Sequence, residues 1–304
     1  MTDPDIGELA AAIVEAHSGR FGSGWELLPA PPAQSDAPVY RAALQACSAL
    51  GFIPIDAEVL ARAWQRRSER TGRFDPAAWP DAPQDFGLRD PATLRTDGFP
   101  ACPQSLGLYA VLPDAAWVGR MARAGVPTVQ LRFKSDDAEA VKREVEAAIA
   151  AVAGTGAQLF INDHWRTAIA AGAWGVHLGQ EDLDALTPTE LAVLRASGVR
   201  LGVSTHGYAE MLRADAVAPS YVALGAVFPT TLKRMPTAPQ GVGRLAAYAR
   251  LLSHYPLVAI GGIDLPRFSE IKATGVGSIA VVRALVAADD PEAAAAQLQA
   301  ALAS

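Results

Sequence analysis

Eight short apolar runs alternate with helical patterns from residue 106 onward, and this alternation restricts the fold more than any other feature. Runs of this length are typical of buried strands, and each is followed by apolar residues at helical spacing. The predicted strands are 106–112, 128–132, 157–162, 174–179, 199–204, 221–227, 257–262 and 277–282. The predicted helices are 115–124, 137–153, 165–171, 188–197, 208–216, 243–253, 266–273 and 291–302. This series of strand–helix pairs predicts an α/β fold, a (β/α)8 TIM barrel.

An open doubly wound sheet is the competing α/β fold. Sheets of that kind usually contain fewer strands and carry a glycine-rich dinucleotide turn after the first one. Here the first predicted strand is followed by Pro-Asp-Ala-Ala-Trp at 113–117, which contains no glycine. The sequence therefore favours the closed barrel.

The N-terminal third of the chain has a different composition, rich in proline, tryptophan and arginine. Prolines in 29–38 and 74–104 indicate loops or extended linkers. Between these segments, 39–70 is predicted to form two helices, the second of them capped at its start by Asp56 and ending in basic residues.

The sequence thus predicts a small, mainly helical N-terminal extension of unknown role, 1–104, followed by the barrel domain, 105–304.

A net charge of −6 argues against broad attraction to nucleic acid or to anionic membranes. No apolar run approaches the roughly 20 residues that span a bilayer, and the N-terminus does not resemble a signal peptide. Cys47 and Cys102 form neither a metal cluster nor a disulfide framework, so we expect a cytoplasmic protein.

Charged residues interrupt the apolar pattern where strands end. In the second predicted strand Gln130, Arg132 and Lys134 share one face, and Asp163 and Asp182 follow the third and fourth strands. The carboxyl ends of barrel strands meet at one rim, where the chemistry lies. Because buried charge needs partners, these residues form either an internal salt-bridge network or a site where Mg²⁺ bridges carboxylates to a phosphate ester. A diphosphate would suit the Mg²⁺ site best, because it needs more charge neutralisation than a single phosphate.

A second rim site is predicted where the seventh strand ends in Gly261 and Gly262. Backbone N–H groups can approach a phosphate closely at glycine, although the alternative is a tight turn without a ligand.

Lys233 lies in a long loop and either contacts a ligand or is an ordinary surface lysine. His177 lies on the fourth predicted strand, where it either contacts a bound ligand or is a hydrogen-bonded histidine of the core. No histidine pairs with Ser or Cys at a spacing typical of a nucleophile triad.

Long segments in a fixed order resemble thiamine-phosphate synthases: GLYAVLPDAAWV, VQLRFK, LFINDHWR, GVHLGQEDL, LGVSTH, ALGAVFPT, MPTAPQGV, VAIGGI and GVGSIAVV. They cover residues 105–303. The resemblance implies a TIM-barrel transferase of thiamine biosynthesis, which joins 4-amino-2-methyl-5-hydroxymethylpyrimidine diphosphate to a thiazole phosphate or its carboxylate. The products are thiamine monophosphate and pyrophosphate. The implied mechanism is dissociative: pyrophosphate leaves first, and the thiazole nitrogen attacks a methylene cation that the aminopyrimidine stabilises.

The same resemblance implies roles for individual residues. Asp163 and Asp182 would hold Mg²⁺, and Lys134, Ser204 and Lys233 would act in catalysis. The residues implied in substrate binding are Gln130, Arg132, Lys134, Asn162, His177, Ser204, Thr230, Lys233, Gly262, Val282 and Arg283. The expected partners are therefore these small molecules, with no nucleic acid and no membrane, and the sequence leaves a homo-oligomer open.

Two residues depart from the family pattern. Leu232 stands where the family usually has threonine, and Arg283 where it tends to have serine. One lost hydroxyl costs on the order of 1 kcal/mol of binding free energy, and Arg283 keeps its backbone N–H. We therefore expect activity to persist with altered thiazole affinity.

Two alternative functions stay open: an isomerase similar to the thiazole tautomerase, which needs no Mg²⁺, and a non-catalytic substrate-binding relative. The sequence does not reveal which thiazole form is preferred.

Overall fold

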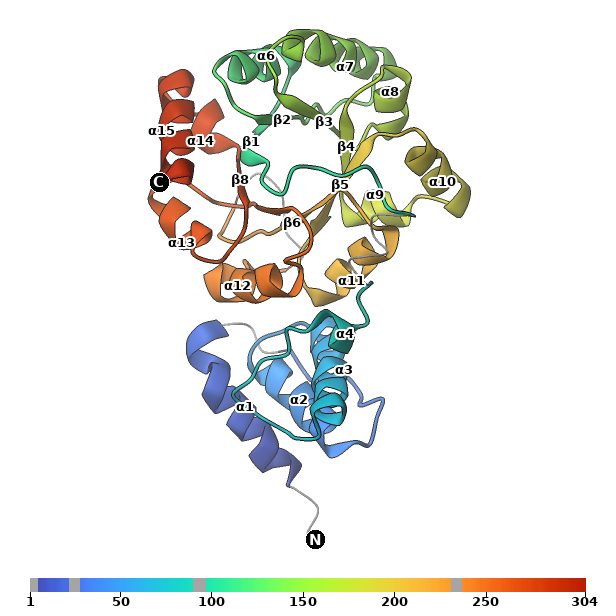
Figure 1. The fold of residues 1–304 in the computed structure, drawn as a ribbon, viewed down its shortest axis with the longest axis vertical. Coiled ribbons are helices and arrows are strands. Elements are labelled where there is room, and N and C mark those ends of the chain that lie inside the picture. Colours follow the sequence, from blue (N-terminus) through green and yellow to red (C-terminus); the bar gives the residue numbers. More distant parts are fainter. Residues whose placement is uncertain (1–4, 22–27, 90–96, 231–236) are drawn as a thin grey trace. The chain divides into compact units, whose positions relative to one another are not determined.

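The strands close into a barrel in which neighbouring strands are parallel and β8 pairs with β1. The structure is a computed structural model that describes residues 5–21, 28–89, 97–230 and 237–304. The strands are β1 (Gly107–Leu112), β2 (Thr128–Leu131), β3 (Gln158–Asn162), β4 (Gly175–Leu178), β5 (Arg200–Thr205), β6 (Tyr221–Leu224), β7 (Leu257–Ala259) and β8 (Ser278–Val281). The predicted (β/α)8 barrel is confirmed, with the strands enclosed by helices (Figure 1).

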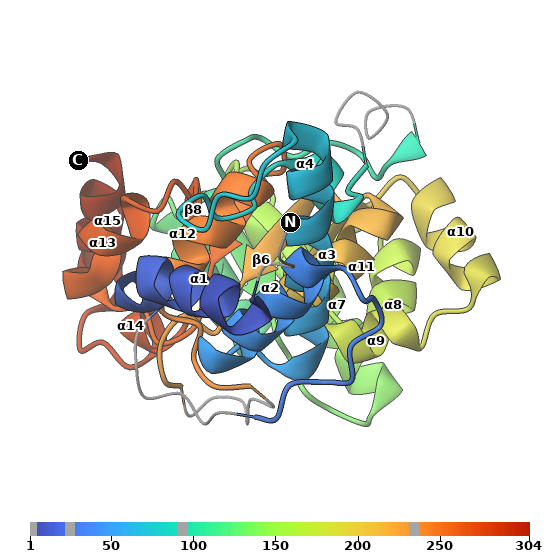
Figure 2. The same cartoon turned by 90° about the horizontal axis from the view of Figure 1, so that it is seen from below.

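A helix follows every strand along the chain. These helices are α6 (Ala115–Arg123), α7 (Ala138–Val152), α8 (Trp165–Ala170), α9 (Gln180–Asp184), α10 (Pro188–Ala196), α11 (Tyr208–Val217), α12 (Gly241–Leu251), η1 (Leu265–Arg267), α13 (Phe268–Lys272), α14 (Arg283–Val286) and α15 (Pro291–Ala303). Asp114, Asp137 and Asp290 accept backbone hydrogen bonds at the starts of α6, α7 and α15, as N-cap residues do. Helices α13, α14 and α15 gather beside one another (Figure 2). Within the described ranges no helix has the length and apolar character needed to cross a membrane.

Alternate strand residues fill the barrel interior. Val111 lies opposite Gln130, and Gln130 lies opposite Phe160, so the three side chains share the inner face. The inner apolar cluster contains Leu106, Tyr109, Val111, Phe160, Tyr221, Ala223, Val258 and Ala280. Val129 and Leu131 point to the other face and are buried there as well, because both faces of a parallel barrel strand are covered.

Two glycines make room for aromatic rings in this interior. A Cβ atom at Gly175 would lie 2.5 Å from the Phe160 ring, and one at Gly202 would lie 2.1 Å from the Tyr221 ring. The interior is close-packed, so a larger residue at either position would displace a ring. The two rings are 5.0 Å apart and nearly perpendicular, which is a favourable arrangement for an aromatic pair.

The sixth and seventh strands are shorter than predicted, ending at Leu224 and Ala259. Gly261 and Gly262 have φ angles of 106° and 65°, in a region that strands do not use and that glycine tolerates. A Cβ atom at Gly262 would lie 2.6 Å from the Pro229 carbonyl oxygen. The chain therefore leaves β7 through a tight, glycine-dependent turn that passes close to the segment after β6.

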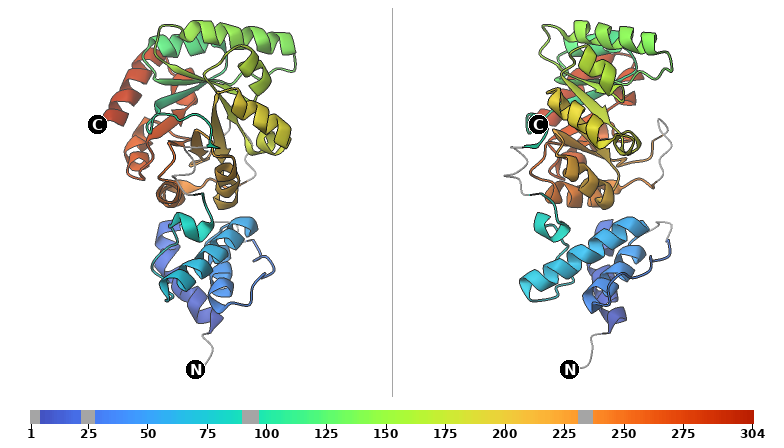
Figure 3. Two further views of the ribbon diagram at one scale, coloured as in Figure 1. Left: turned by 45° about the vertical axis from the view of Figure 1, so that its right-hand side comes forward. Right: turned by 90° about the vertical axis from the view of Figure 1, so that its right-hand side faces the viewer.

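The chain divides into two compact units, Met1–Asp90 with Gly207–Ala216, and the remaining residues. The first unit contains α1 (Ile6–Phe21), α2 (Pro38–Ala49), α3 (Pro54–Thr71) and the short α4 (Pro83–Phe86), together with α11. Proline occupies the start of α2, α3 and α4, where its missing N–H costs nothing. Helix α2 packs against both α1 and α3 (Figure 3). The two helices predicted within 39–70 are confirmed, and α4 adds one helical turn to the predicted loop 74–104.

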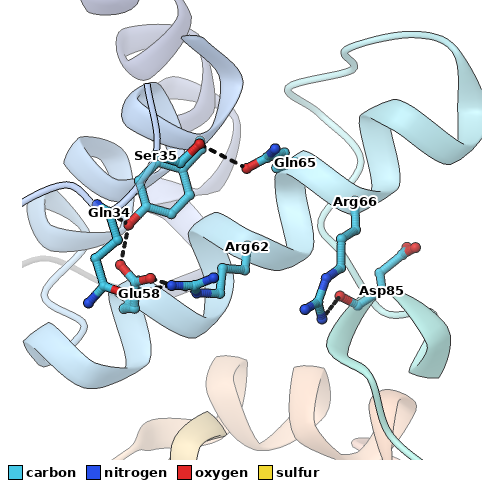
Figure 4. A network of polar contacts seen from close by, with 8 residues as sticks. Gln34, Ser35, Glu58, Arg62, Gln65, Arg66 and Asp85 are labelled. Atoms are coloured by element: carbon cyan, nitrogen blue, oxygen red, sulfur yellow. Dashed lines mark hydrogen bonds and ion pairs between the residues drawn. The ribbon is translucent and has the colours of Figure 1, made fainter. Parts of the chain in front are cut away.

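An aromatic cluster forms the core of this first unit. The Trp79 ring lies 4.5 Å from Phe21 and 4.9 Å from His17 between ring centroids, and its indole N–H donates to the Tyr208 hydroxyl at 2.9 Å. Polar contacts join its helices and loops: Ser35 donates to Gln65, and Arg66 donates to the Asp85 carbonyl (Figure 4). Two nitrogens of Arg70 also donate to the buried Asp85 carboxylate, at 2.8 and 2.7 Å.

Asp56 does not cap α3, so that prediction is wrong. The helix begins earlier, at Pro54, with Ile53 in the N-cap position. The buried Asp56 carboxylate instead accepts a 2.8 Å hydrogen bond from the Ala209 N–H, in the first turn of α11. A Cβ atom at Gly207 would lie 2.0 Å from this carboxylate. Asp56 therefore stabilises the N-terminus of α11, which is distant from it in sequence.

Candidate active site

The polar residues at the carboxyl end of β2 differ in exposure. Gln130 is buried inside the barrel, Arg132 is half-buried, and Lys134 is exposed beyond the strand. The ammonium group of Lys134 forms an ion pair with the carboxylate of Asp163, which follows β3. The structure therefore brings Lys134 and Asp163 together at one rim of the barrel.

Asp163 has an unusual backbone conformation, with a φ angle of 64°. Residues other than glycine rarely adopt this left-handed region. The conformation is held from both sides: the Asp163 N–H donates to the His177 carbonyl at 3.0 Å, and the Trp165 N–H donates to the Asp163 carbonyl at 2.8 Å. Such strain is found disproportionately at functional sites.

Asp182 lies on the short helix α9 rather than at the end of a strand. Its carboxylate accepts a 3.1 Å hydrogen bond from the Gly179 N–H, which fixes it near the end of β4. Burial first, and then the neighbouring Asp163 carboxylate, raise the pKa of Asp182 above its usual value, while Lys134 opposes the rise. The effect of the Asp163 carboxylate on the pKa of Asp182 means that the two side chains are close enough to share a cation.

His177 and Ser204 are joined directly in the barrel interior. Nε2 of His177 lies 2.8 Å from Ser204 Oγ, and Nδ1 lies 2.6 Å from the Tyr221 hydroxyl. The Gln180 side-chain amide donates to the Ser204 carbonyl at 2.7 Å, so the end of β5 is held from α9. Asn162, at the end of β3, is buried beside His177 in the strand register.

Sequence reasoning missed three residues of this arrangement: Tyr109, Tyr221 and Gln180. The Tyr109 hydroxyl lies 2.7 Å from the Tyr221 hydroxyl and accepts a 3.0 Å hydrogen bond from the Gln130 amide. Both tyrosines lie in strand segments whose sequence pattern predicts only an apolar core. The available signal was their position, because both occupy inward-facing positions of their strands.

The residues predicted at the second rim site lie around the ends of β7 and β8. Gly262 follows β7, and Val282 is the N-cap residue of α14, whose first residue is the exposed Arg283. Thr230 is half-buried in the segment after β6. Lys233 and Leu232 lie outside the described residues, so their predicted roles remain predictions.

The donor set at the first rim site fits a hard divalent cation. Asp163 and Asp182 supply carboxylate oxygens, the ligands that Mg²⁺ prefers. Over the described part of the chain no group of three or more His, Cys, Asp or Glu side chains is placed to hold a metal ion. Mg²⁺ commonly binds through one or two carboxylates and completes its shell with water and substrate phosphate, so two carboxylates suffice here.

The closed parallel barrel, with its polar residues at the carboxyl ends of the strands, defines this chain as a (β/α)8-barrel enzyme. Its sequence places it in a family. The family model described as thiamine monophosphate synthase matches residues 108–285. The chain belongs to the thiamine-phosphate synthase family.

Individual relatives agree with this assignment. The thiamine-phosphate synthase of Neisseria meningitidis serogroup B is 55% identical over 195 residues, which cover 64% of this chain and 94% of that protein. The thiamine-phosphate synthase of Salmonella dublin is 54% identical over 200 residues, covering 66% and 93%. A solved thiamine phosphate pyrophosphorylase from Pyrococcus furiosus superposes with a TM-score of 0.56 at 28% identity, covering 65% of this chain and 96% of that one.

Proposed function

We propose that the barrel domain, 105–304, joins the pyrimidine diphosphate to the thiazole phosphate and releases pyrophosphate. Membership of the thiamine-phosphate synthase family supports this reaction. The observation that carries it is the cluster of Lys134, Asp163 and Asp182, which offers a cation site and an ammonium group at one rim. A diphosphate leaving group needs this combination, because its departure concentrates negative charge.

The first step breaks the bond between the pyrimidine methylene carbon and the diphosphate oxygen. Both electrons of that bond go to the diphosphate, which Lys134 and the Ser204 hydroxyl stabilise, with Lys233 as a further predicted contact. When bound at Asp163 and Asp182, Mg²⁺ supplies additional charge neutralisation to the diphosphate oxygens. Lys134 already stands beside the Asp163 carboxylate, so the ammonium group needs no large reorganisation.

The second step forms a bond between the thiazole nitrogen and the methylene carbon. Gln130, Asn162 and His177 would orient the pyrimidine within the barrel mouth, and Arg132 would bind its diphosphate. The thiazole phosphate would bind at the second rim site, at Thr230, Gly262 and the backbone of Val282 and Arg283. Catalysis then consists of leaving-group stabilisation and positioning, which agrees with the absence of a nucleophile triad from the sequence pattern.

Product analysis tests the proposal. The purified full-length chain is incubated with Mg²⁺ and both substrates, and thiamine phosphate is measured by mass spectrometry beside pyrophosphate. We expect the two products in equal amounts, and neither product when one substrate is omitted. A thiazole tautomerase would instead interconvert thiazole isomers without Mg²⁺, and a substrate-binding relative would bind both molecules without turnover. Either result would contradict the proposal.

The extension 1–104 is proposed to be a separate module, which is supported by a family match that begins only at residue 108. Cys47 and Cys102 are both free thiols. The cytoplasmic location stays a prediction that cell fractionation would test.

A further inference from the structure

Five polar side chains form a continuous hydrogen-bonded chain through the barrel interior, from β2 to β5. In order they are Gln130, Tyr109, Tyr221, His177 and Ser204. Each link is between 2.6 and 3.0 Å long. The two tyrosines are 2% and 0% exposed, and they pack against the ring of Phe160.

The Gln130 end of this chain favours one direction. The Gln130 amide nitrogen can only donate, so the Tyr109 oxygen is an acceptor at that link. Burial raises the pKa of both tyrosines, so each keeps its single hydroxyl proton. In the favoured direction Tyr109 donates its proton to Tyr221, and Tyr221 donates to Nδ1 of His177. This direction requires the Nε2–H tautomer of His177, which donates to Ser204 Oγ.

This direction has consequences at both ends. The Gln130 carbonyl oxygen is left as an acceptor, and the Ser204 hydroxyl proton is left to donate elsewhere. If every link were reversed, Ser204 would donate to His177, and Tyr109 would donate to the Gln130 carbonyl oxygen. The Gln130 amide nitrogen would then be left as a donor. A hydroxyl with one proton cannot support both directions at once, so the two ends of the chain are coupled.

We propose that Tyr109 and Tyr221 are positioning residues, whose hydroxyl groups fix the donor and acceptor polarity of Gln130 and Ser204 for the pyrimidine diphosphate. This inference rests on the proposed function. The polarity fits that substrate, because an aminopyrimidine presents an N–H donor to the Gln130 carbonyl. A diphosphate oxygen is an acceptor for the Ser204 hydroxyl. Gly202 is part of the arrangement, since a side chain there would displace the Tyr221 ring.

Phenylalanine substitutions remove the hydroxyl groups and keep the rings. For Tyr109→Phe and Tyr221→Phe we expect KM for the pyrimidine diphosphate to rise about tenfold each, the effect of losing one buried hydrogen bond. KM for the thiazole phosphate should change less than about twofold. The double variant should be no worse than the more severe single one, because either change interrupts the same chain. Tyr248→Phe is the matched control, since it removes a buried hydroxyl that bonds Gln240 outside the chain.

A spectroscopic readout tests the chain without turnover. In ¹⁵N NMR of the full-length chain with labelled histidine, His177 should be the Nε2–H tautomer, and Tyr221→Phe should shift its Nδ1 resonance while Tyr248→Phe should not. A His177 protonated on Nδ1 in the unsubstituted protein would overturn the inference, and so would unchanged or additive KM effects of the phenylalanine variants. If the unsubstituted protein lacked synthase activity, the proposed function would fail, whereas the tautomer and its response to Tyr221→Phe would still decide whether the chain exists.

Discussion

Asp163 and Asp182 lie close enough for the Asp163 carboxylate to raise the pKa of Asp182. One residue follows β3 and the other lies in the first turn of α9, so the contact depends on neighbouring barrel strands. The Lys134 ammonium offsets the repulsion between the two carboxylates only in part, because the pKa of Asp182 stays raised beside it. We therefore expect a divalent cation bound at the pair to stabilise the fold.

Asp182→Asn tests this expectation by thermal unfolding. The raised pKa means that protonation of Asp182 favours the folded state, so this contribution is complete below its unfolded pKa and is lost as pH rises through its folded pKa. At neutral pH without metal, we expect the neutral amide to raise the melting temperature. Mg²⁺ should raise the melting temperature of the unsubstituted protein and leave that of Asp182→Asn nearly unchanged. A variant less stable than the parent in EDTA would refute this account of the carboxylate pair.

Lys134→Gln should reduce turnover by removing positive charge from the rim. We expect kcat/KM for the pyrimidine diphosphate to fall by roughly 100-fold, the lower end of the range measured when one charge-stabilising donor is lost. Stability should change little, because the Lys134 side chain is 56% exposed and exposed ion pairs contribute little. Lys142→Gln on α7 is the control, since that lysine is also exposed but lies within a helix. Equal activity of the two variants would contradict the role of Lys134.

Gly202→Ala should destabilise the barrel. The added methyl group has no space beside the Tyr221 ring, and overpacking of this kind costs about 1–3 kcal/mol of unfolding free energy. Gly19→Ala in α1 is a matched contrast, because nothing lies within 4 Å of the new methyl group. We expect that change to stabilise by about 0.5–1 kcal/mol, since alanine favours a helix over glycine. Urea titrations of both variants measure the difference, and a neutral Gly202→Ala would show that the ring can move.

Asp56→Ala should weaken the first turn of α11. Loss of a carboxylate that accepts a helix N-terminal N–H typically costs about 1 kcal/mol. Asp290→Ala, which removes the N-cap of α15, is the control for a generic capping loss. Because α11 directly follows β5 and Ser204, we expect Asp56→Ala also to raise KM for the pyrimidine diphosphate, whereas Asp290→Ala should not. Identical kinetics for the two variants would show that the first unit has no influence on the site.

Much of the fold could be predicted because burial imposes periodicity on both strands and helices. Every predicted barrel helix is present, and most boundaries agree within one or two residues. The ends of β6 and β7 were predicted too far along, since an apolar run does not show where the chain turns. The short helix α9 was missed because five residues contain too few turns for a helical pattern.

The candidate site was predictable only as far as neighbouring strands bring residues together. Lys134 and Asp163 converge because β2 and β3 are adjacent, which the barrel topology implies. The hydrogen bonds of the Tyr109 and Tyr221 hydroxyl groups could not be predicted, because a tyrosine within an apolar run indicates only a buried core position. Likewise, Asp56 looked like a local helix cap, and its bond to Ala209 depends on packing that local sequence does not encode.

The most direct test of the account is the Mg²⁺ dependence of pyrophosphate release by the full-length chain and by Asp163→Asn. With both substrates saturating, we predict release by the unsubstituted protein that rises with Mg²⁺ and stops in EDTA. Asp163→Asn should be slower by at least about 100-fold at every Mg²⁺ concentration. Release that continues undiminished in EDTA, or that Asp163→Asn leaves unchanged, would contradict the claim that this carboxylate pair holds the metal for the leaving diphosphate.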